Sequence, residues 1–277
     1  MKLQQTIKRS FIRWDRTLAL SKRQQFVIVT LVLVAILMLT QLMPVEYRYG
    51  MTILLAICTF FLSALALRED LNGIEWITLL TLPTLFTAAV ALFYLLLPQR
   101  WLTRVPFVAL YAVGIYALLL TENIYNVAAD RTIALLRAAH SVGFLFTLVT
   151  YFMLVQTVLA FRFPFYVNAL LVFMISGILA FQSIWSSELE RKASVRVKKI
   201  SFAIAVIMSE LACIYSFWPM QATLIVLFLT TSFYGLVGMG QQYVVEKLYK
   251  KTVMEFFILA TIIFIISMVS THWRGNI

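Results

Sequence analysis

The chain has 277 residues, of which 62% are hydrophobic and only 13% are charged, and its formal net charge is +11 at pH 7. Soluble domains are nearer about 45–50% apolar, so this composition excludes an ordinary soluble protein and predicts an integral membrane protein. The segments between its apolar stretches are too short to form a soluble catalytic domain. We attribute the positive charge to membrane topology and anionic lipid headgroups and expect no nucleic acid partner.

The first 24 residues form a basic tail that we predict to be an amphipathic helix on the membrane surface. Its apolar residues recur every three or four positions, which places them on one helical face, and basic residues face the other way. The apolar positions are Leu3, Ile7, Phe11, Trp14 and Leu18, and the basic ones expected to contact lipid are Lys8, Arg9, Arg13 and Arg16. The alternative is a basic leader that only directs insertion.

Residues 25–277 contain nine apolar stretches, each long enough to cross the ~30 Å hydrocarbon layer as a helix. Prolines mark several of the turns between them. The sequence therefore predicts one all-α domain, a polytopic transmembrane helix bundle. We place its spans near 25–43, 49–67, 75–97, 104–123, 136–161, 165–184, 200–217, 220–241 and 253–272.

The distribution of basic residues predicts the orientation of this bundle. Eighteen of the 23 Lys and Arg residues fall in the N-terminal tail and the even-numbered connections, and five fall on the other side. Because short cytoplasmic segments retain Lys and Arg, the N-terminus is predicted to be cytoplasmic. With nine spans the C-terminus would then lie outside, and we expect a multi-pass protein of the cell's cytoplasmic membrane.

Glu210 stands near the centre of the predicted seventh span, and a charged side chain there costs about 2.5–3.5 kcal/mol to insert. One hypothesis is that this carboxyl couples the movement of a proton or cation. The alternative is a structural role, in which Glu210 hydrogen-bonds to a polar side chain on a neighbouring helix.

A second polar group lies at the cytoplasmic ends of the predicted fourth and fifth spans. A hairpin turning near 124–133 would bring Glu122 level with Arg137, so we expect an ion pair between them, and His140 to sense or relay a proton. The alternative is a purely structural ion pair with a snorkelling arginine. The candidate residues of this group are Glu122, Asn123, Asn126, Arg137 and His140.

Known catalytic and metal-binding motifs are missing from the sequence. It contains no His-Glu-x-x-His, Gly-x-Ser-x-Gly or phosphate-loop pattern, and it has only two His and two Cys residues. We therefore expect no catalytic residues, no metal site and no cofactor.

The stretches Thr81–Pro98 and Thr121–Tyr151 resemble uncharacterised multi-pass membrane proteins of small-genome bacterial lineages. This resemblance implies a bacterial cytoplasmic membrane. It brings no activity and no functional residues with it.

The leading hypothesis for function is a transporter or channel for a small solute, ion or proton, with a polar path near Glu210 and Glu122–His140. The alternative is a non-catalytic scaffold or assembly subunit that binds membrane protein partners or further copies of itself. A membrane-embedded lipid-modifying enzyme is the third hypothesis.

Overall fold

The computed structural model describes residues 21–67, 75–97, 101–128, 135–189 and 193–271. Within these ranges the regular secondary structure is entirely α-helical. The expected helix over residues 1–24 and its basic residues Lys8, Arg9, Arg13 and Arg16 lie almost wholly outside the described residues. The helices are α2 (Lys22–Leu42), α3 (Val45–Leu67), α4 (Glu75–Leu95), α5 (Trp101–Ala128), α6 (Leu136–Ala160), α7 (Phe165–Glu188), α8 (Val195–Tyr215), α9 (Ala222–Val244) and α10 (Lys250–Val269).

These helices confirm the predicted polytopic bundle, and eight of the nine described are long and apolar enough to cross a membrane. The exception by composition is α8, because any 18-residue stretch of it contains at least Lys198, Lys199 and Glu210. It nevertheless packs lengthwise against α7, and this is the most extensive helix pair in the bundle. The structure therefore describes a membrane-embedded, multi-pass helical protein.

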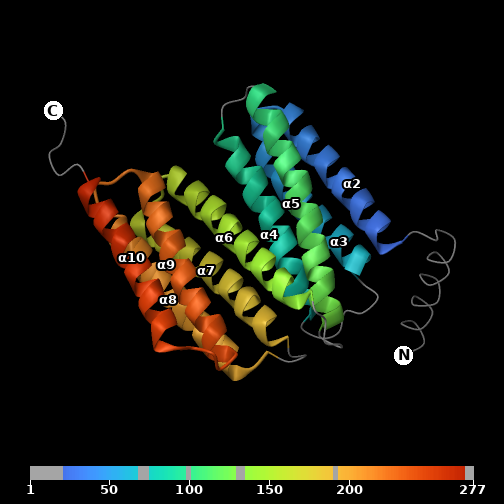
Figure 1. Cartoon of the computed structure of the whole chain (residues 1–277). Coiled ribbons are helices and arrows are strands. Elements are labelled where there is room, and N and C mark those ends of the chain that lie inside the picture. The colour runs from blue at the N-terminus through green and yellow to red at the C-terminus, as the bar shows by residue number, and fades with distance from the viewer. Residues whose placement is uncertain (1–20, 68–74, 98–100, 129–134, 190–192, 272–277) are drawn as a thin grey trace, which may run out of the picture.

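The helices form two groups joined by α6 (Figure 1). In the first group α2 packs on α3 and α5, and α4 packs on both α3 and α5. In the second group α7, α8 and α9 contact one another, while α10 contacts α9 at the edge. Helix α6 packs against α4 and α5 on one side and α7 and α9 on the other. Any polar contact made by α6 can therefore link the two groups.

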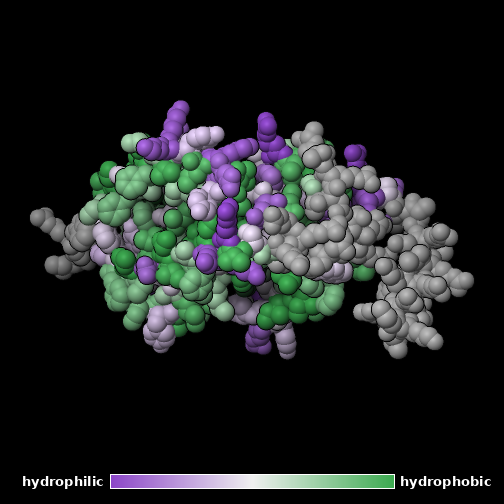
Figure 2. All heavy atoms as spheres, turned by 90° about the horizontal axis from the view of Figure 1, so that it is seen from below, coloured by the Kyte–Doolittle hydropathy of each residue, from purple (hydrophilic) through white to green (hydrophobic). Residues whose placement is uncertain are grey.

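Successive helices alternate in direction, so the bundle has two ends. We call the end where α2 begins the Lys22 end, and the end where α8 connects to α9 the Trp218 end. The last described helix, α10, also finishes at the Trp218 end (Figure 1). Figure 2 looks at the Lys22 end from below and shows hydrophilic side chains near the centre and at the upper and lower edges of the view, among many hydrophobic ones.

Local sequence signals explain where several helices begin. Ser21 caps α2 through a capping box with Gln24, and the Ser194 side chain accepts a hydrogen bond from the Val197 N–H at the start of α8. Because of this cap, α8 begins five residues before the predicted span at 200. Pro164 precedes α7 in a tight connection from α6, where a proline fits because it needs no helical N–H donor.

Gly143 on α6 allows α5 and α6 to approach closely. A Cβ atom added at this glycine would stand 2.5 Å from the Tyr125 hydroxyl oxygen. The absence of a side chain therefore creates the space in which the Tyr125 phenol packs against α6.

Candidate functional site

A layer of polar side chains crosses the bundle near its Lys22 end, beginning at α5. The Asn126 side-chain amide donates to the Leu67 carbonyl oxygen on α3 at 3.2 Å. The Tyr125 hydroxyl donates to the Ala139 carbonyl oxygen on α6 at 2.9 Å. Two consecutive residues of α5 thus tie this helix to its neighbours on opposite sides.

The same layer continues from α6 into the second group. His140 Nε2 lies 2.8 Å from the Ser186 carbonyl oxygen on α7. Since a carbonyl oxygen only accepts, Nε2 carries the hydrogen in this bond. Gln241 Nε2 on α9 lies 2.9 Å from both the carbonyl oxygen and the hydroxyl oxygen of Ser183 on α7. We call this layer the polar belt, and it comprises Glu122, Tyr125, Asn126, His140, Ser183, Ser186 and Gln241.

Glu122 is the one acidic residue of the polar belt, and its environment is unusual. Its side chain has no exposed surface, and neither carboxyl oxygen has a hydrogen-bond partner among the described residues. It stands six residues before the end of α5, about 9 Å along the helix axis. The predicted span ended at 123, but α5 continues to Ala128 and so encloses Glu122 inside the bundle. Buried polar groups are nearly always satisfied, so an unpartnered carboxyl needs an explanation.

Other unpartnered oxygen atoms occur within one helical turn of this depth. The Ser63 hydroxyl on α3 is fully buried without a partner, and so is the Asn126 side-chain carbonyl oxygen. The Asn126–Leu67 bond sets the register of α3 and α5, which run in the same direction. Ser63 and Glu122 each lie one turn before those two residues and are therefore at the same level of the bundle.

The ion pair predicted between Glu122 and Arg137 is wrong. Arg137 is exposed at the start of α6, whereas both Glu122 carboxyl oxygens lie in the interior without a partner. The hairpin does bring these two helices together, but the phenol of Tyr125 fills the contact with α6 beside Gly143. Of the other predicted residues, His140 and Asn126 join the polar belt, and Asn123 is half-buried.

Glu210 is separate from this site. It lies on the exposed face of α8, only five residues before the helix ends at Tyr215, so it is not central in its span as predicted. The neighbouring Ser209 hydroxyl donates to the Ala169 carbonyl oxygen, 2.9 Å away and one turn inside the start of α7. The expected common path for Glu210 and the Glu122–His140 region is therefore not formed: one lies outside near the Trp218 end, the other inside near the Lys22 end.

Sequence reasoning did not assign a role to several residues of this site. Tyr125 and Gln241 make the contacts that connect helices, and Ser63 lies level with Glu122, yet none of the three is a charged residue that hydropathy marks. The spacing of Glu122 and Asn126 by one helical turn, with Ser63 one turn before the end of α3, was the available signal.

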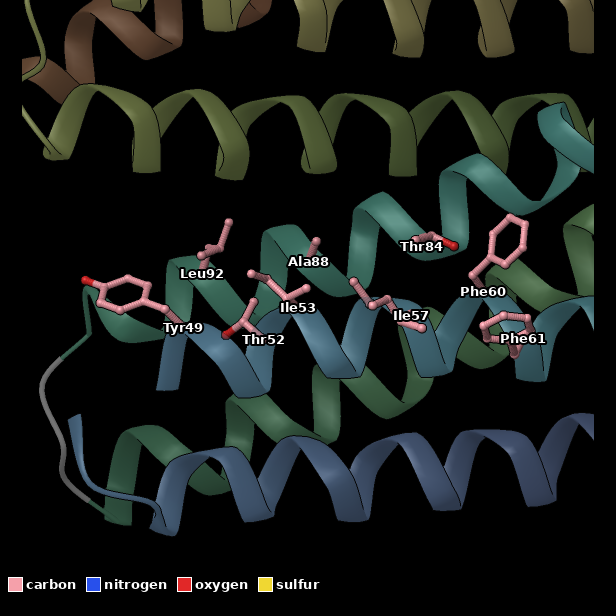
Figure 3. A pocket seen from close by; sticks show the side chains of 10 residues that line it. Tyr49, Thr52, Ile53, Ile57, Phe60, Phe61, Thr84, Ala88 and Leu92 are labelled. Carbon is pink, nitrogen blue, oxygen red and sulfur yellow. The ribbon is translucent and has the colours of Figure 1, made fainter. Parts of the chain in front are cut away.

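Apart from the polar belt, a groove of about 520 Å³ lies between α3 and α4 (Figure 3). Thr84, Ala88 and Leu92 line it from α4, and Tyr49, Ile53 and Phe61 are among the residues that line it from α3. The hydroxyls of both its threonines donate to carbonyl oxygens of their own helices. The surface offered is apolar, so it suits a lipid chain and not a polar solute.

Within the described ranges no group of three or more His, Cys, Asp or Glu residues is placed to hold a metal ion. The polar belt contains one acid, one imidazole and several amide or hydroxyl groups. Such a set can exchange a proton or surround a single positive charge.

An all-helical bundle of apolar helices with a polar belt in its interior defines the chain as a polytopic helical membrane protein. Residues 45–270 match the family described as "Protein of unknown function (DUF5656)", and the chain belongs to that family. This match covers α3 to α10 and includes the polar belt. No curated protein and no solved structure matches the chain.

Proposed function

We propose that the protein carries a proton or a monovalent cation across the membrane and that Glu122 is the carboxyl that binds it. The observation that supports this function is the fully buried Glu122 side chain, whose two oxygens have no partner among the described residues. Acidic residues inside membrane proteins are rare and costly, and they commonly mark ion pathways and proton relays.

The number of charges in the polar belt favours a singly charged substrate. Glu122 supplies one carboxyl, while the Ser63 hydroxyl at the same level and the Asn126 side-chain carbonyl one turn further along α5 are neutral oxygen acceptors. Divalent cations usually require more carboxylate groups at ligating distance. A proton or a monovalent cation is therefore the substrate class that this chemistry suits.

The position of the belt also favours transport. Its hydrogen bonds run from α3 through α5, α6 and α7 to α9, so they join the two helix groups across α6. Carriers commonly place their binding site between two groups of helices that rock against each other. Within the belt, the His140–Ser186 bond is the described hydrogen bond that ties α6 to the second group.

Flux through reconstituted proteoliposomes tests this proposal. An imposed pH or Na⁺ gradient should drive uptake in the unchanged protein, and Glu122→Gln should abolish it, because the amide keeps the size of the side chain without its ionisable group. Glu210→Gln is the matched control and should retain full flux. Equal flux in Glu122→Gln and the unchanged protein would overturn the assignment.

An assembly subunit is the second candidate function, and the exposed face of α8 favours it. Ile207, Glu210, Ile214 and Phe217 share this face and are all exposed. A carboxylate facing lipid is costly, so a partner helix with a basic or hydrogen-bonding group at that depth would stabilise it. Mass measurement after extraction in mild detergent tests this role: Glu210→Leu should release a partner or a second copy, and an unchanged mass would oppose it.

A further inference from the structure

A separate cavity of about 280 Å³ opens among four helices of the second group, at the Trp218 end. It lies where α6 and α8 end and where α7 and α9 begin. The residues that line it include Arg162, Phe165, Asn168, Tyr215, Ser216 and Trp218. None of them belongs to the polar belt, which is at the opposite end of the bundle.

The cavity has one buried acceptor that the fold leaves unused. The Asn168 side chain is only 6% exposed, and its amide nitrogen donates to the Phe163 carbonyl oxygen at 3.0 Å. Its carbonyl oxygen has no hydrogen-bond partner within the described part of the chain. A buried acceptor that lines a cavity in this state suits a ligand that donates a hydrogen bond.

Positive charge is available at the same cavity. Arg162 is exposed in the connection between α6 and α7. Its backbone φ angle is 52°, which lies in the left-handed region that glycine usually occupies. The N-termini of α7 and α9, which also border the cavity, lack side-chain caps and add partial positive charge. No acidic residue is among the described residues that line the cavity. These features suit an anionic group.

Aromatic rings complete the wall. The Tyr215 and Trp218 rings lie 5.8 Å apart, and the Trp218 indole N–H is already bonded to the Thr271 hydroxyl oxygen at 2.9 Å. Both residues line the cavity, and aromatic rings attract ammonium groups. The volume lies just below the range of about 300–1,000 Å³ for drug-sized ligands, so the ligand is small.

We propose that this cavity binds a phosphate group linked to a primary ammonium group, as in phosphoethanolamine. The phosphate would pair with the Arg162 guanidinium, and the ammonium would donate to the Asn168 carbonyl oxygen within the aromatic part of the wall. Such a group exists both free in solution and as the headgroup of a phospholipid, and a cavity at the end of the bundle is accessible to either.

Binding of free phosphoethanolamine to the full-length protein, purified in detergent, tests the two-point recognition. Phosphoethanolamine should bind at least tenfold more tightly than inorganic phosphate, measured by calorimetry. Arg162→Gly should weaken its binding at least tenfold, and this variant should fold because glycine suits the left-handed backbone. Leu189→Gly is the matched control: Leu189 has φ 50 at the other end of the bundle, so it relieves the same conformation without touching the cavity.

A second arm distinguishes the source of the ligand. Nanodiscs of phosphatidylethanolamine should compete with phosphoethanolamine if the lipid headgroup occupies the cavity. Phosphatidylcholine nanodiscs should not, because the methylated ammonium has no N–H donor. Competition by phosphatidylethanolamine alone would identify the lipid, and absence of competition together with tight binding of the free compound would identify a soluble ligand. Equal binding of phosphate and phosphoethanolamine, or an unchanged affinity in Arg162→Gly, would overturn the proposal.

Discussion

Glu122 and Glu210 are both acids within long apolar helices, but the fold treats them in opposite ways. Glu122 has no exposed surface and sits level with other buried oxygens, whereas Glu210 is exposed on the outer face of α8. Hydropathy alone marks both as equally costly. The two residues differ in whether their helix face is covered by neighbouring helices. Helix α5 is surrounded by α2, α3, α4 and α6, whereas α8 contacts α7 and α9.

This comparison shows that the depth of a residue along a span and the direction in which its side chain points, into the bundle or toward lipid, are separate properties. An exposed acid can be stabilised from outside the chain, by lipid headgroups or by a partner helix. An enclosed acid must be accommodated by the protein alone. Variants that treat the two positions alike should therefore give very different results.

The largest contrast should come from lysine. Glu122→Lys places a long cation in a sealed site without a partner and should destabilise the bundle by about 3–5 kcal/mol or prevent its folding. Glu210→Lys should cost less than about 1 kcal/mol, because the ammonium can reach the Trp218 end from the exposed face. Folded yield by gel filtration and unfolding in denaturing detergent measure both. Similar losses in the two variants would remove the distinction between enclosed and exposed acids.

The next contrast concerns the space that Gly143 leaves for Tyr125. Gly143→Ala should push the phenol away from α6 and cost about 2–4 kcal/mol, from overpacking and the lost hydrogen bond to the Ala139 carbonyl. Gly50→Ala is the control, since nothing lies within 4 Å of a Cβ there and alanine favours helix. Thermal unfolding of the two variants checks this. A Gly143→Ala protein as stable as the control would show that Tyr125 does not pack as described.

Removing only the Tyr125 hydroxyl should have a smaller effect. Tyr125→Phe keeps the ring beside His140 and loses the bond to the Ala139 carbonyl, for an expected cost of about 0.5–1.5 kcal/mol. Tyr49→Phe, at an exposed tyrosine, should change stability by less than about 0.5 kcal/mol. If the two changes cost the same, the hydroxyl does not hold α5 to α6.

The smallest effect should appear in a double-mutant cycle on Glu122 and Arg137. Since the structure separates the enclosed carboxyl from the exposed guanidinium, the two alanine substitutions should be additive within about 0.5 kcal/mol. A coupling energy above about 1 kcal/mol would restore the ion pair that the sequence alone predicted.

The helices themselves could be predicted closely from the sequence, because apolar length is a strong signal in membrane proteins. Every predicted span corresponds to a helix, and the span predicted at 136–161 differs from α6 by one residue. The main errors are at polar ends. Helix α5 continues past Glu122 and Asn126 to Ala128, and α8 starts at Val195 among lysines, because buried packing and a serine cap extend both beyond their apolar cores.

The candidate site was less accessible to sequence reasoning. The sequence singled out Glu122, Asn126 and His140, but it gave them the wrong partner in Arg137. The real connections use a carbonyl oxygen at Leu67 and another at Ser186, and backbone acceptors have no signature in a sequence. Glu210 became a candidate because it is charged and well inside an apolar stretch, and only the fold reveals its exposed face.

The length of α5 has a consequence for the membrane itself. Its 28 residues extend about 42 Å, whereas a typical hydrocarbon core is about 30 Å thick. Roughly 12 Å must therefore be accommodated by tilting, by local thickening of the bilayer or by projection into the headgroups. Because α5 packs in the middle of its group, its neighbours must share any tilt that it takes. Bilayer thickness should thus act on the first helix group as a whole, through hydrophobic mismatch.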